Sequence, residues 1–117
     1  LEAETYENAG KAASAFEESV KYRDDSAIAP SAKLGIADSY RHLNRQKEAI
    51  PILTALAENV VDKEVHDDAL SMLAWCQMDI QAWNDAKNTW RTLIRRFPES
   101  RFAADARLQL AQLQLMH

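Results

Sequence analysis

The residues best suited to chemistry in this chain lie together near its middle. His66, Asp67 and Asp68 are consecutive, and imidazole and carboxylate groups are common metal ligands. Consecutive residues on a helix point in different directions, however, so the three cannot converge on one ion. The run instead indicates a solvated helix start whose acids are favoured by the helix dipole. We therefore expect no metal site and no cofactor.

A single cysteine, Cys76, is the other candidate for chemistry. No internal disulfide can form, and a Cys–His nucleophile pair would need His42 or His117 nearby, which nothing in the spacing supports. Its place between Ala74 and Ile80 predicts a buried, inert thiol. With no phosphate loop and no nucleophile–base pair in the sequence, we expect no catalytic residue and no enzyme.

Charge narrows the possible partners. The formal net charge is −4, which gives no electrostatic reason to expect nucleic acid. No run of about 18 apolar residues is present, so we expect no direct membrane insertion. Arg91, Arg95, Arg96 and Arg101 surround the expected end of a helix, where cations complement the dipole. A patch for phosphate or an acidic partner is the alternative for these arginines.

The elements that position these residues are helices. Two glycines and three prolines exclude a fold rich in turns, and a period of 3.6 residues recurs along the chain. Pro30 suits the start of a helix, Asp62 and Ser100 suit N-caps, and we expect Pro51 to fall about one turn into its helix, at little cost. The six expected helices are about 3–23, 30–43, 46–60, 64–79, 82–97 and 100 onward. Short loops make consecutive helices antiparallel hairpins.

Alanines recur every 37 residues in three rows. The first row is Ala12, Ala49 and Ala86, the second is Ala37, Ala74 and Ala111, and the third is Ala32, Ala69 and Ala106. Small residues at fixed positions let helices cross closely, with large neighbours filling the grooves. A period of this length predicts a solenoid in which each unit buries its apolar face against its neighbours.

The repeat resembles the tetratricopeptide repeat. The residues that match its pattern are Leu70, Leu73, Ala74, Trp83, Ala86, Trp90, Leu93 and Pro98, preceded by Ile36, Ala37, Tyr40, Ala49, Leu53 and Leu56. Val61 stands where the pattern usually has proline. The resemblance implies an all-α, right-handed solenoid of antiparallel helical hairpins in one domain, as a fragment of a longer chain. Its parts would be a half repeat 1–25, repeats 30–61 and 64–98, and a half repeat 100–117.

The spacing also resembles one branch of this family. The 37-residue step is longer than the usual 34, and Phe97–Ser100 forms the link to the next helix. Both features are similar to those of bacterial envelope repeat proteins, especially the Tol–Pal-associated division coordinator and an outer-membrane assembly lipoprotein. The resemblance implies binding of partner proteins without catalysis. It suggests the periplasm, with the cytoplasm as the alternative.

In this family the first helix of each hairpin lines a concave groove that holds a peptide. The positions carried over are Leu34, Asp38, His42, Ser71, Met72, Trp75, Asp79, Leu108, Gln112 and Leu115. Trp75 is not a packing position of the repeat, so we expect either a groove anchor beside Met72 or internal packing. The positions of the family's carboxylate clamp hold no cation, so that clamp is not expected. An apolar groove rimmed by Asp38 and Asp79 suits a segment with apolar anchors and some basic residues.

The last helix supports a second hypothesis. It carries more apolar residues than a solvated capping face needs, namely Leu108, Leu110, Leu113, Leu115 and Met116. The terminal half repeats would then pair with further repeats or with another copy of the chain. On this hypothesis the chain is a structural spacer or an oligomerisation segment.

Overall fold

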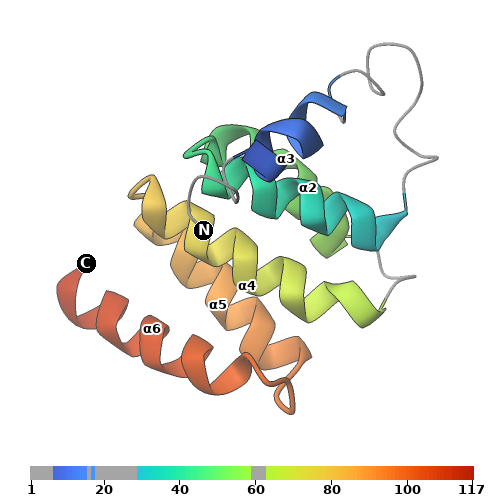
Figure 1. Cartoon of the computed structure of the whole chain (residues 1–117). Helices are drawn as coiled ribbons and strands as arrows, with labels where there is room; N and C mark the ends of the chain where they lie inside the picture. Colours follow the sequence, from blue (N-terminus) through green and yellow to red (C-terminus); the bar gives the residue numbers. More distant parts are fainter. Residues whose placement is uncertain (1–6, 16, 18–28, 59–62) are drawn as a thin grey trace.

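The fold is an array of helices that pack in chain order. The computed structural model describes residues 7–15, 17, 29–58 and 63–117, and Figure 1 shows their arrangement. Residues 7–15 are helical. The helices that follow are α2 (Pro30–His42), α3 (Gln46–Glu58), α4 (Lys63–Asp79), α5 (Trp83–Arg96) and α6 (Ala103–Met116). The described part of the chain contains no strand, which confirms the all-α expectation.

Each helix from α2 to α6 packs against the next, and α2 also contacts α4. The alanine rows lie at these crossings, because Ala37, Ala49, Ala74 and Ala86 are completely buried. Small side chains at these positions let the helix backbones approach closely, as the spacing predicts. The exceptions are Ala32 on α2 and Ala111 on α6, which are exposed, and Ala12, which is partly buried.

Two apolar clusters form the core. The first surrounds Leu53 and takes residues from α2, α3 and α4, and the second surrounds Trp90 and takes residues from α3 to α6. Helix α4 belongs to both, since Leu73 packs in the first cluster and Leu70 in the second. The core is therefore continuous along the array and has no single centre.

The turns after α2 and α4 repeat one geometry. Asn44 and Gln81 have positive φ angles of 58° and 63°. After α2, the amide of Arg45 donates to the carbonyl oxygen of Tyr40 at 2.8 Å, and after α4 the amide of Ala82 donates to Gln77 at the same distance. This pattern is the Schellman motif, in which a left-handed residue ends a helix. The two hairpins are thus closed in the same way, one period apart.

The expected start of the last helix needs one correction. Ser100 does not cap α6, because Phe102 holds the N-cap position. Its hydroxyl instead accepts the Phe102 amide at 3.1 Å and donates to Asp67 Oδ2 at 2.7 Å, which ties this turn to α4. Asp62 and much of the expected first helix lie outside the described residues.

Pro51 lies inside α3, which begins at Gln46 as expected. The first carbonyl acceptor of the helix is Arg45, reached by the amide of Ala49 at 3.3 Å. An amide at position 51 would therefore face the carbonyl of Lys47, and proline removes that bond. The expectation of little cost is wrong.

Candidate functional site

A polar pocket lies where the α2–α3 turn meets the last turn of α4. Its volume is about 460 Å³, and its lining residues are Arg41, His42, Asn44, Gln46 and Asp79. A second pocket of about 220 Å³ shares Asn44 and Gln46 with it and reaches Ile80. Two of the expected groove residues, His42 and Asp79, therefore lie at one pocket.

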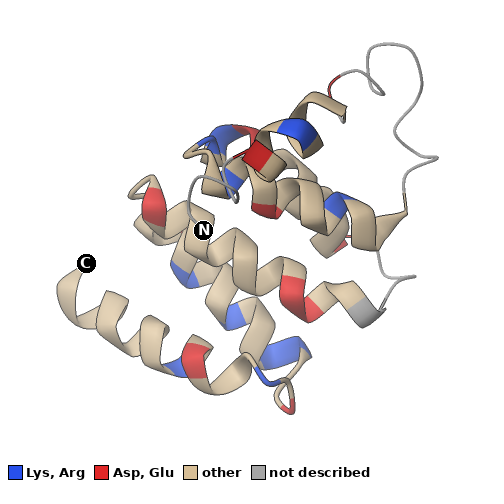
Figure 2. Cartoon of the chain, viewed as in Figure 1, with Lys and Arg blue, Asp and Glu red and all other residues tan. Residues whose placement is uncertain are grey.

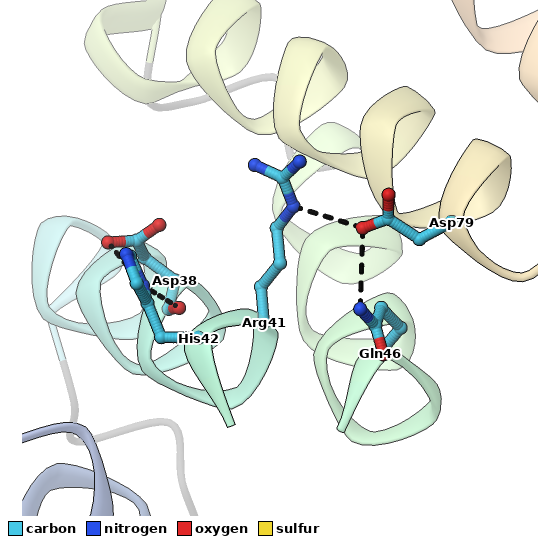
Figure 3. Close-up of polar contacts among 5 residues, drawn as sticks. All are labelled: Asp38, Arg41, His42, Gln46 and Asp79. Carbon is cyan, nitrogen blue, oxygen red and sulfur yellow. Dashed lines mark hydrogen bonds and ion pairs between the residues drawn. The ribbon is translucent and has the colours of Figure 1, made fainter. Parts of the chain in front are cut away.

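Asp79 is held by two donors within this pocket. Arg41 Nε lies 3.2 Å from Asp79 Oδ2, and Gln46 Nε2 donates to the same oxygen at 3.3 Å (Figure 3). The Arg41 and Asp79 side chains are each about one-third exposed, 35% and 33%. Part of the charge of Asp79 is therefore offset within the chain. The expectation that Asp79 rims the groove and favours basic partners stays a prediction.

Arg41 is the site residue that the sequence did not reveal. It lies outside the family's clamp positions, and it reaches the site only because α2 and α4 lie side by side. Its two terminal nitrogens point away from Asp79 in Figure 3 and have no partner among the described residues. Guanidinium nitrogens donate well to carboxylate and carbonyl oxygens. The pocket thus offers two guanidinium donors to a ligand.

Asp38 and His42 form a separate pair on α2. His42 Nδ1 lies 2.8 Å from the backbone oxygen of Asp38 and 3.5 Å from its carboxylate Oδ2. Figure 3 shows this pair on the opposite side of Arg41 from Asp79. The histidine is turned back onto its own helix, so Asp38 also has a local partner.

The apolar part of the expected groove lies further along α4. Trp75 is partly exposed, and its ring meets the buried Trp90 edge to face, with centroids 5.5 Å apart and planes at 87°. Leu34 and Met72 are half-buried against the first cluster. Trp75 therefore packs against Trp90 with one part and faces solvent with another, and its role as a groove anchor stays a prediction.

The remaining expected groove residues are either buried or lie on another helix than Trp75 and Met72. Ser71 is buried, with 6% of its surface exposed, so it offers little area to a partner. Leu108, Gln112 and Leu115 are exposed on α6, which packs against α5.

The run at the start of α4 diverges as expected but is not solvated. Asp67 binds Ser100, and Asp68 lies 4.0 Å from Arg101. Burial raises the pKa of Asp68, and the positive charge of Arg101 opposes this. His66 is only 4% exposed, lies edge-on to Phe97 with ring centroids 5.9 Å apart, and has no partner for Nε2 among the described residues. The prediction of a solvated start is wrong for His66.

The other two candidates behave as the sequence predicts. Cys76 is completely buried, and burial raises the pKa of its thiol to about 11. Such a thiol is almost entirely protonated at neutral pH and is a poor nucleophile. Arg95 and Arg96 lie in the last turn of α5, where they complement the helix dipole, and Figure 2 shows basic residues along this helix.

Within the described helices, no segment combines the length and the apolar character that a bilayer span requires. The same residues hold no group of three or more potential metal ligands.

Comparison with known proteins gives one match. The sequence profile described as Tetratricopeptide repeat matches residues 68–100, which cover most of α4, all of α5 and the turn that follows. No curated protein and no solved structure matches the chain. The matched segment contains Leu70 to Pro98, one of the two sets of residues on which the resemblance rests, and the other set, Ile36 to Leu56, lies outside it. Together with the order of the packed helices, this match supports membership of the tetratricopeptide repeat family.

Proposed function

We propose that the chain is a non-catalytic protein-interaction module that holds a segment of a partner protein across α2 and α4. One observation carries the proposal. Trp75 is fixed from behind by the buried Trp90 and still exposes part of its surface. A rigid, partly exposed tryptophan gives contact area at low entropic cost, and tryptophan is enriched among residues that dominate binding.

The polar pocket at the end of α4 defines the second contact. Met72 and Trp75 would receive apolar anchors of the partner, while the terminal nitrogens of Arg41 would bind a carboxylate or a backbone carbonyl. Arg41 and Asp79 together favour a partner with a polar or acidic group at this end. This is an alternative to the expectation of a partner with some basic residues, because Asp38 and Asp79 both have local partners.

The proposal is tested by panning a random peptide display library on the chain and titrating an enriched peptide. Replacing Trp75 with alanine should weaken binding by about 2 kcal/mol, or roughly 30-fold, if its side chain is the anchor. Trp83→Ala is the matched control, since Trp83 is also partly exposed but stacks on His117 with ring centroids 4.3 Å apart.

Both variants are first compared by circular dichroism, so that a loss of fold is not mistaken for a loss of binding. A selective loss in Trp75→Ala supports the groove. Equal affinities for the original chain and both variants would reject it, as would an equal loss in the two.

A second function is favoured by the surface of α6. Leu108, Leu115 and Met116 are 53%, 88% and 73% exposed, more apolar surface than a solvated outer helix needs. We therefore also propose that the chain serves as an oligomerisation or spacer segment through this helix. The two functions use different faces and do not exclude each other.

We further propose that the partners belong to a bacterial envelope. This placement rests on the 37-residue step and on the turn at Phe97–Ser100 alone. Fractionation of the source cells with an antibody to the chain tests it, and recovery in the cytoplasmic fraction alone would reject it.

A further inference from the structure

The outer face of α5 carries a stripe of amide and guanidinium groups. Its members, which we call the α5 stripe, are all exposed: Asn84, Asn88, Arg91 and Arg95. They follow one another at steps of four, three and four residues, so they lie along one line of the helix. The buried residues of α5, such as Ala86 and Leu93, lie on the opposite side. From its first to its last residue the stripe extends for about 16 Å along the helix axis.

The exposure of this face is a property of the repeat. One period earlier, on α3, the equivalent residues are Lys47, Pro51, Thr54 and Glu58. Three of them are exposed and Thr54 is half-buried, although α3 packs against both α2 and α4 and a complete hairpin follows it. This line of the second helix of a hairpin therefore belongs to the outer surface of the array. The two arginines have no counterpart on α3, so packing of the repeat does not require them.

The cations of α5 repel one another and have no acid to offset them. Lys87, Arg91 and Arg95 are four residues apart, a spacing at which like charges destabilise a helix. Lys87 donates to the backbone oxygen of His117 at 2.8 Å, and Arg91 Nη1 donates to the neutral Asn88 Oδ1 at 3.2 Å. Among the described residues, no carboxylate lies within ion-pair distance of Arg91 or Arg95. A charge pattern that weakens the helix itself points to a partner outside the helix.

The charge of the whole chain limits the size of that partner. Residues 83–117 carry six Lys or Arg and three Asp or Glu, whereas residues 1–82 carry eight and fifteen, so a net charge of +3 follows one of −7. Figure 2 shows basic residues along α5. A large polyanion, such as duplex nucleic acid or an anionic membrane surface, would also meet the acidic part of the chain. A short acidic segment can lie on α5 alone, which favours a protein partner.

We infer that the α5 stripe binds an acidic segment of a partner protein. The guanidinium groups of Arg91 and Arg95 donate to carboxylates, and the two asparagine amides bind the backbone of the segment. The two arginines lie about 6 Å apart along the helix axis, which is close to the spacing of alternate residues in an extended chain. Because Trp75 contacts the buried Trp90, the stripe lies on the side of α5 turned away from the groove. The inference is therefore independent of both proposed functions.

The test is a titration of the whole chain into a fluorescently labelled peptide, followed by anisotropy. The probe is a peptide of about twelve residues in which glutamate and serine alternate, and its control has glutamine in place of glutamate. At about 50 mM NaCl the glutamate peptide should bind saturably and about tenfold more tightly than the glutamine peptide. At about 500 mM NaCl this difference should largely disappear, because salt screens exposed charge pairs.

A pair of double variants assigns the binding to the stripe. Arg91→Gln with Arg95→Gln should weaken binding of the glutamate peptide about tenfold, because it removes both charged donors. Lys11→Gln with Lys47→Gln is the matched control, since it changes the net charge equally at exposed positions outside α5. This control should bind almost as the original chain does. All four side chains are exposed, and circular dichroism checks that both variants keep their helices.

Three results would overturn the inference. The first is no saturable binding of the glutamate peptide at low salt, and the second is an equal loss of affinity in the two double variants, which would show an effect of net charge alone. The third is tighter binding of a single-stranded oligonucleotide of the same charge, since the stripe would then serve a nucleic acid. Trp75→Ala should bind the glutamate peptide as the original chain does, so failure of the groove proposal is measured separately.

Discussion

Neighbouring residues on α4 have opposite environments. Trp75 is partly exposed, whereas Cys76 is completely buried against the first cluster. A helix turns by about a quarter of a circle per residue, so one step separates a surface that can bind from a side chain that cannot react. Reactivity at this point of the chain is therefore set by burial and not by residue type.

The buried thiol of Cys76 should lower the free energy of unfolding as the pH rises above 9. Burial raises the pKa of Cys76 from 9.0 to about 11, so the thiol ionises earlier in the unfolded chain than in the folded one. Its contribution is fully present below pH 9 and is lost as the pH rises towards 11. We expect the free energy of unfolding to fall by about 2 kcal/mol through this group over that range.

Urea unfolding of the original chain and of Cys76→Ala, at pH 8 and pH 11, measures this effect. Tyrosines and lysines also titrate there, but they do so in both proteins, so the difference between the two slopes isolates the thiol. Identical pH dependence in the two proteins would show that the thiol is not shielded.

Single residues are also where sequence reasoning was weakest. The burial of His66 follows from contact with Phe97, which is 31 positions away at the end of α5, the other helix of the same hairpin. The role of Arg41 follows from the side-by-side placement of α2 and α4. Neither contact can be recognised from nearby residues in the sequence, because both form where separate helices pack together. The only sequence feature that could have indicated Arg41 is its position three residues after the expected groove residue Asp38, which places both on one face of the helix.

At the scale of the elements, the two Schellman turns, at Asn44 and Gln81, differ in backbone strain. Asparagine tolerates the left-handed region, but glutamine adopts it with steric strain. Gln81, with a φ of 63°, therefore stores strain at the end of α4 that Asn44 largely avoids at the end of α2. The residue at the left-handed position is thus less favourable in the second hairpin than in the first.

Replacing Gln81 with glycine should therefore stabilise the fold. We expect a gain of about 1 kcal/mol in the free energy of unfolding, because glycine adopts positive φ without a Cβ clash. Thermal or urea unfolding measures the gain. Gln81→Ala is the control and should give none, and Asn44→Gly should give less. A loss of stability in Gln81→Gly would mean that the glutamine side chain makes a compensating contact.

The sequence predicts the elements better than it predicts single contacts. The helices expected at 30–43, 64–79 and 82–97 agree with α2, α4 and α5 to within about one residue at each end. Their apolar residues recur at helical spacing, and breakers such as Pro30 and Pro98 mark their limits. The start of α6 was placed three residues early, because Ser100 has the chemistry of an N-cap and uses it on Asp67 and Phe102.

At the scale of the whole molecule, stability is distributed along the array. The first cluster centres on Leu53 and the second on Leu93 and Trp90, and all three side chains are completely buried. In repeat proteins stability is close to a sum of units and the contacts between neighbours. A mutation in one cluster should therefore lower the local stability of the helices around that cluster more than that of the helices around the other cluster.

Two matched core deletions test this. Leu53→Ala and Leu93→Ala each leave a cavity of similar size and should each cost about 2–5 kcal/mol locally. Amide hydrogen exchange should accelerate mainly in α2 and α3 for the first variant, and mainly in α5 and α6 for the second. Equal acceleration along the whole chain in both variants would show a single cooperative unit.

The placement of the tryptophans has an optical consequence. Trp75, Trp83 and Trp90 are the three tryptophans of the chain, and all lie on α4 and α5. Indole fluorescence therefore reports mainly on the second hairpin and its contacts, whereas far-ultraviolet circular dichroism reports on every helix. The first hairpin, α2 and α3, contains no tryptophan. If the two halves lose their structure at different temperatures, the two spectroscopic signals will separate without any added dye.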